Sequence, residues 1–133
     1  MKTLGIDLSL THTGVVALDK GKLVSKKSIL TKPAGKRPID EINRLQSIVD
    51  QVCFIVDEFA PEVVAIEGIA FMSRKTTALA QLAGLNYLLR SQLMRRGISF
   101  IIVAPTSLKK FVTDKGNAQK DEIHHFYLFF SVK

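Results

Sequence analysis

The chain has 133 residues, of which 47% are hydrophobic and 23% charged, proportions typical of one globular domain. It contains no run of eighteen apolar residues, which argues against a membrane-spanning helix. Nineteen Lys and Arg against twelve Asp and Glu leave a net charge of +7, and acids become scarce after Glu67. This balance makes a polyanion such as nucleic acid a reasonable partner, although a basic protein without such a partner has a similar composition.

The cysteine content and the first residues indicate the cellular compartment. A single cysteine, Cys53, excludes an internal disulfide, and its place on the apolar stripe of a predicted helix is typical of a small core residue. The first seven residues have the pattern of a strand and lack the charged-then-apolar layout of a secretory signal. We therefore expect one cytoplasmic domain over residues 1–133.

The first third of the chain predicts an antiparallel meander of three strands. Apolar runs separated by turn residues place these strands at residues 3–8, 14–19 and 23–30. Lys20-Gly21 predicts a tight turn before the third strand, which is rich in lysine and is expected to be more exposed. The Pro, Gly and charged residues of 31–37 predict a loop.

Helices and strands alternate over the rest of the chain. Residues 38–59 have apolar side chains at the i, i+3, i+4 spacing of a helix that packs one face on a sheet, and Pro61 ends this pattern. The expected elements that follow are a strand at 63–67, a helix at 76–96, a strand at 100–103 and helices at 105–112 and from 118. This order predicts an α/β domain whose mixed sheet has helices on both faces.

The predicted helix at 76–96 is apolar on more than one side. One stripe is enough to pack on a sheet, so Leu and Ala residues are left over on the other side. We expect these residues to form the contact of a symmetric homodimer, the commonest kind of oligomer.

Two acids end apolar strands that are predicted to be central. Asp7 follows Leu4-Gly5-Ile6, and Glu67 follows the apolar run 63–66. An ionised carboxylate in such a place is costly unless it is paired or binds a metal, and ligands bind at the carboxyl ends of strands in open α/β sheets. If the two strands are neighbours, both carboxylates meet at one point and suit Mg²⁺. The alternative is that each acid caps a turn or pairs with a lysine.

Three segments of the sequence stand out as motifs: residues 5–14, residues 65–71, and residues 103–112 with 115–120. Taken together, they resemble the RuvC-type Holliday-junction resolvases of the RNase H-like superfamily. Residues 5–14 (GIDLSLTHTG) are similar to the first-strand motif of this family, and residues 65–71 (AIEGIAF) are similar to its second acidic motif. Residues 103–112 (VAPTSLKKFV) with 115–120 (KGNAQK) are similar to the segment before its last helix. The style of these motifs resembles bacterial and phage-encoded members.

The resemblance implies an RNase H-like five-stranded sheet and a dimeric endonuclease that uses Mg²⁺ or Mn²⁺ to make paired nicks in branched DNA, at four-way junctions. By the same resemblance, Asp7 and Glu67 match metal-binding catalytic acids. Lys109 and Lys120 match lysines near DNA phosphates, and Phe71 matches an apolar residue that meets unpaired bases, although a buried core phenylalanine is an equal alternative. The other cations expected on the DNA surface are Arg74, Lys75, Lys110 and Lys115.

One part of the family pattern is missing. The family completes its metal site with two carboxylates on a final helix, whereas residues 124–133 of this chain contain no acid. We therefore expect a domain whose final helical region is truncated or altered. The alternative function is a structure-specific DNA-binding protein that has lost catalysis. A fragment of an ATP-binding sugar kinase would require a second phosphate-binding glycine motif and a second domain, and the chain is too short for both.

Overall fold

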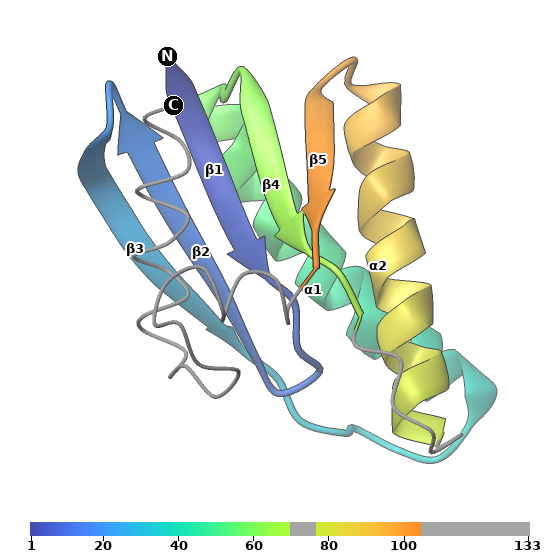
Figure 1. Ribbon diagram of the computed structural model, residues 1–133. Helices are drawn as coiled ribbons and strands as arrows, with labels where there is room; N and C mark the ends of the chain where they lie inside the picture. The colour runs from blue at the N-terminus through green and yellow to red at the C-terminus, as the bar shows by residue number, and fades with distance from the viewer. Residues whose placement is uncertain (70–76, 105–133) are drawn as a thin grey trace.

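The computed structural model describes residues 1–69 and 77–104 (Figure 1). They form five strands and two helices: β1 (Lys2–Asp7), β2 (His12–Asp19), β3 (Lys22–Leu30), α1 (Pro38–Phe59), β4 (Val63–Glu67), α2 (Thr77–Arg95) and β5 (Ser99–Val103). Each lies within two residues of the bounds that the sequence predicts, and β4 matches them at both ends. No helix in these ranges is long and apolar enough to cross a membrane.

The sheet is mixed, as predicted. Its strand order is β3-β2-β1-β4-β5; β1, β2 and β3 pair antiparallel, while β4 is parallel to both β1 and β5. The tight turn between β2 and β3 has positive φ at both central residues, Lys20 (53°) and Gly21 (76°), and this is the turn geometry that fits the twist of a two-residue hairpin. β2 begins two residues earlier than expected, because His12 still pairs with Leu30.

The long helix α1 begins and ends where its sequence dictates. Pro38 occupies its first turn, where a missing N–H costs nothing. Ala60 ends it in the left-handed conformation, and Pro61 follows. One face of α1 is buried and includes Ile48, Val52 and the expected core cysteine, Cys53.

Both described helices pack on the same face of the sheet. A single apolar cluster joins side chains of α1, α2 and the strands, with Leu4, Ile6 and Val15 on the sheet side. The cluster includes side chains from β1, β2, β3 and β4, so it stabilises the sheet across these four strands. Val16 and Leu18, which alternate with Val15 along β2, are also buried. The helices predicted after residue 104 lie outside the described residues.

Candidate metal centre

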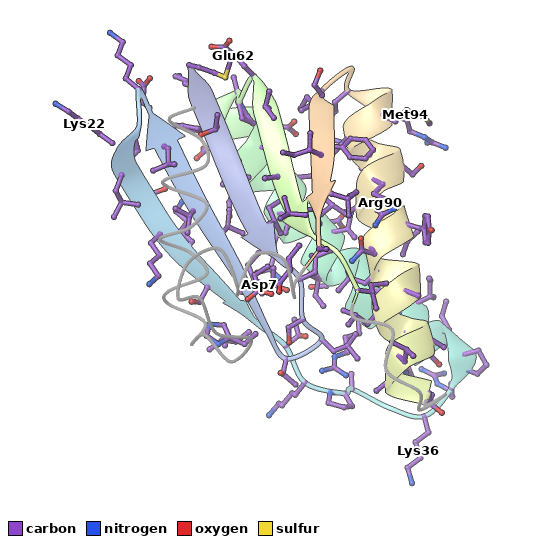
Figure 2. All side chains as sticks on the ribbon, in the orientation of Figure 1. Asp7, Lys22, Lys36, Glu62, Arg90 and Met94 are labelled. Carbon is purple, nitrogen blue, oxygen red and sulfur yellow. The ribbon has the colours of Figure 1, made fainter. Side chains whose placement is uncertain are left out.

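Asp7 and Glu67 end neighbouring parallel strands. The register of β1 with β4 pairs Gly5 with Ala65 and Ile6 with Ile66, so the next position on each strand carries the acid. Adjacent strands lie about 4.8 Å apart, and residues at one register position point to the same face of the sheet. The fold therefore brings the two predicted acids to one point at the carboxyl end of the sheet, where Figure 2 shows Asp7 at the end of β1.

The two carboxylates differ in exposure. Asp7 is 9% exposed, whereas Glu67 is half-buried. Removing an ionised carboxylate from water costs several kcal/mol, roughly, unless charge or hydrogen bonds compensate it. Within residues 1–69 and 77–104, no group of three or more His, Cys, Asp or Glu could hold a metal ion. The described part of the site thus offers two hard oxygen ligands, to which water and a phosphate can add.

The backbone around Glu67 is tightly packed. The amide of Gly68 donates a hydrogen bond of 2.7 Å to the carbonyl of Val103 on β5. A Cβ at position 68 would come within 3.1 Å of the Ile102 side chain, closer than most real contacts. Glycine therefore lets the chain leave β4 close beside β5, directly after Glu67.

The comparisons with known proteins agree with this geometry. The model of the family described as crossover junction endodeoxyribonuclease RuvC matches residues 3–129. The chain belongs to the RuvC family.

Relatives within the family are of moderate similarity. The RuvC of Bifidobacterium animalis subsp. lactis is 33% identical over 123 residues, which are 90% of this chain and 62% of that protein. The RuvC of Bifidobacterium longum subsp. infantis is 34% identical over 126 residues, 92% of this chain and 63% of its own length. The chain thus spans just over three fifths of the length of these curated relatives.

Solved structures show the same fold. RuvC of Thermus thermophilus in complex with a Holliday junction substrate has a TM-score of 0.73 at 17% identity, with 99% of this chain and 97% of that one covered. A second structure of Thermus thermophilus RuvC has a TM-score of 0.66 at 22% identity, covering 95% and 77%. A hexokinase of the ROK family from Thermus thermophilus has a lower TM-score, 0.53, and this chain covers only 38% of it.

Seven residues predicted to bind DNA lie outside the described residues: Phe71, Arg74, Lys75, Lys109, Lys110, Lys115 and Lys120. Their role in a RuvC-family protein stays a prediction from the sequence.

The turn after Asp7 is held by its own side chains. The Thr13 hydroxyl is fully buried and donates a hydrogen bond of 2.8 Å to the carbonyl of Ser9. The Ser9 amide donates back to the Thr13 hydroxyl at 3.2 Å, and the Ser9 hydroxyl accepts the amides of Thr11 and His12, each at 3.3 Å. The Thr13 side chain is therefore a structural part of this turn.

Arg44 is a residue of this region that the sequence did not reveal. From α1 its guanidinium donates to the carbonyl of Leu10 at 2.9 Å, and also to the carbonyl and the hydroxyl of Thr31 at 3.4 and 3.3 Å. The Thr31 hydroxyl itself donates to the Leu10 carbonyl. Arg44 thus ties the turn after Asp7 to the start of the loop after β3.

Replacing Arg44 with Ala should loosen this junction without unfolding the domain. The Thr31 amide, which donates to the Thr11 carbonyl at 3.1 Å, should exchange its proton about 10- to 100-fold faster, since hydrogen bonds to a charged group contribute roughly 1.5–3 kcal/mol. Amide hydrogen exchange followed by NMR measures this. Arg95→Ala, at an exposed position in the last turn of α2, is the control and should leave the rate unchanged. Equal rates in Arg44→Ala and the unchanged protein would contradict the role of Arg44.

Proposed function

We propose that the chain is the metal-dependent endonuclease domain of a Holliday-junction resolvase, acting on branched DNA. One observation carries the proposal: in a chain of the RuvC family, Asp7 and Glu67 end neighbouring parallel strands at adjacent register positions. The name of the related proteins, crossover junction endodeoxyribonuclease, and the Thermus thermophilus RuvC complex with a Holliday junction substrate support the choice of DNA and reaction.

Asp7 and Glu67 are the residues that would hold the cation. Carboxylate oxygens are the ligands that Mg²⁺ and Mn²⁺ prefer, and the ends of two strands hold them on rigid backbone. When bound, such an ion supplies Lewis-acid polarisation of the phosphate and a water of lowered pKa, which is the chemistry of phosphodiester hydrolysis. Two-metal hydrolysis needs further oxygen ligands, beyond the two that the described part of the chain contributes.

Asp7→Asn should abolish nicking of a synthetic four-way junction while leaving junction binding within about threefold. The reason is that the amide keeps the shape of the side chain but removes the negative charge that a divalent cation needs. Loss of even an outer-shell partner costs roughly 10- to 100-fold, so loss of a direct ligand should cost at least about 100-fold in the nicking rate. The measurement scores binding and nicking separately, with Mg²⁺ and with Mn²⁺.

Asp19→Asn is the matched control. Asp19, the last residue of β2, lies opposite Lys2 in the strand register, at the other end of the sheet from Asp7. It should nick like the unchanged chain. Nicking by Asp7→Asn at the unchanged rate would reject the proposed catalytic acid. Binding without nicking by the unchanged chain would favour the alternative, a structure-specific DNA-binding protein with impaired catalysis.

A homodimer through α2 belongs to the same proposal. Leu82 and Leu88 pack against the core, so they are not left over for a partner. Tyr87 and Met94 are exposed instead, at 64% and 66%. The Arg90 guanidinium lies 4.8 Å from the centre of the Tyr87 ring, and Figure 2 shows Arg90 and Met94 on α2 beside the edge strand β5. An aromatic ring, an Arg and a Met are side chains enriched at interfaces.

Sedimentation equilibrium tests this contact. The unchanged chain should form dimers as its concentration rises, and Tyr87→Glu combined with Met94→Glu should shift it to monomer, because two buried charges per protomer would oppose the symmetric contact. Phe54→Glu places a charge at a 61% exposed site on α1 and should leave the dimer intact. A strict monomer at high concentration of the unchanged chain would contradict the proposal.

A further inference from the structure

The loop between β3 and α1, residues 31–37, lies at the same end of the sheet as the two acids. It leaves the carboxyl end of β3 and passes below the sheet to α1 (Figure 1). Its three cations are Lys32, Lys36 and Arg37, all exposed, and it contains no acid. Figure 2 shows Lys36 toward the end of the molecule that Asp7 occupies and Lys22, the first residue of β3, at the opposite end.

Both ends of this loop are anchored. At its start, Thr31 accepts from Arg44 and its amide donates to Thr11. At its end, Arg37 donates to the Asp40 carboxylate from its amide at 3.1 Å and from its guanidinium at 2.9 and 2.8 Å. A Cβ at Gly35 would collide with that carboxylate, so glycine allows the loop to pass α1 closely while the Arg37–Asp40 pair stays in place. The loop therefore holds its lysines along a fixed path.

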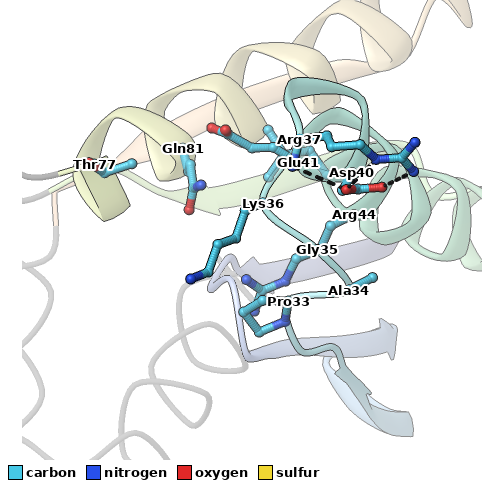
Figure 3. A pocket seen from close by; sticks show the side chains of 11 residues that line it. Pro33, Ala34, Gly35, Lys36, Arg37, Asp40, Glu41, Arg44, Thr77 and Gln81 are labelled. Atoms are coloured by element: carbon cyan, nitrogen blue, oxygen red, sulfur yellow. Dashed lines mark hydrogen bonds and ion pairs between the residues drawn. The ribbon is translucent and has the colours of Figure 1, made fainter.

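The charges around the loop leave Lys32 and Lys36 as the cations that are available to a ligand. Arg37 is engaged by Asp40, and this pairing keeps the pKa of the Asp40 carboxyl below its ordinary value. Neither Lys32 nor Lys36 forms an ion pair within residues 1–69 and 77–104. Figure 3 shows Lys36 extending away from the Arg37–Asp40 pair, on the side of Thr77 and Gln81 at the start of α2.

A cavity of about 280 Å³ lies between the loop and the start of α2. Lys36, Arg37 and Arg44 line it with positive charge, against Asp40 and Glu41. Since Asp40 is neutralised by Arg37, the remaining charges of the lining are two cations and one acid. Polar groups of Thr77 and Gln81 complete the opposite wall.

We propose that this loop is a second contact surface for DNA, on which Lys36 and Lys32 bind backbone phosphates of an arm of the substrate. The inference rests on the proposed function, because it takes DNA as the polyanion. A lysine ammonium binds phosphate as a point charge without reading sequence. A loop that is fixed before binding loses less conformational entropy when it binds. This surface would add positive charge from the N-terminal half of the chain to that of the acid-poor sequence after Glu67.

The test compares two double variants that remove the same charge. Lys32→Ala with Lys36→Ala changes the loop, whereas Lys22→Ala with Lys27→Ala removes two exposed lysines of β3. The affinity of each for DNA is measured over a series of salt concentrations. The loop variant should reduce the slope of log affinity against log salt by about two, because each phosphate contact contributes roughly one unit. The β3 variant should keep the slope of the unchanged chain.

Gly35→Ala tests the fixed path without any change of charge. The added methyl group collides with the Asp40 carboxylate and displaces either the loop or that side chain from Arg37, so the anchor at the end of the loop is weakened in both cases. Affinity at fixed salt should fall several-fold while far-UV circular dichroism stays native. Unchanged affinity would overturn the part of the proposal that depends on an anchored loop.

Each titration is run on a four-way junction and on a linear duplex of equal length. A junction bound no more tightly than the duplex would count against the proposed function, yet the loop contribution would remain measurable on the duplex. An unchanged salt slope in the Lys32/Lys36 variant on both DNAs, or an equal fall in the Lys22/Lys27 variant, would overturn the inference and leave the proposed function standing.

Discussion

The parallel pairing of β1 with β4 is the constraint on which the site depends. Because the register pairs Ile6 with Ile66, the next residues, Asp7 and Glu67, occupy adjacent positions. A slip of one residue would turn one carboxylate to the opposite face and place its apolar neighbours away from the core. Ile6 and Ile66 are both fully buried, so the apolar cluster opposes such a slip. The packing that stabilises the domain therefore also sets the arrangement of the two acids.

The sequence predicted the strands, the helices and the acid pair because each has a local signal. An apolar run that ends in one acid is visible at both Asp7 and Glu67, and the period of α1 is clear over 22 residues. The homodimer contact expected on α2 stays a prediction, and fewer Leu residues are left over for it than one sheet-facing stripe implies. Leu82 and Leu88 pack against the core as well, a wider buried face than a single sheet-facing stripe predicts, since α2 also contacts α1.

Contacts made through backbone groups could not be predicted from the sequence. Arg44 bonds the carbonyls of Leu10 and Thr31, which any residue carries, across separations of 34 and 13 residues. The close approach of Gly35 to Asp40 depends in the same way on the path of the loop. These contacts connect the turn after Asp7 with the loop that carries Lys36 and with Arg44 on α1, so two segments that are distant in the chain meet near the acids.

Binding of Mn²⁺ is the most direct test of a shared cation site. Mn²⁺ is paramagnetic and broadens the NMR signals of nuclei near it. In the ¹⁵N-labelled chain, broadening should centre on the amides that flank Asp7 on β1 and Glu67 on β4, and it should disappear in Asp7→Asn. Broadening centred on other carboxylates, or persisting at both strand ends in Asp7→Asn, would contradict the account.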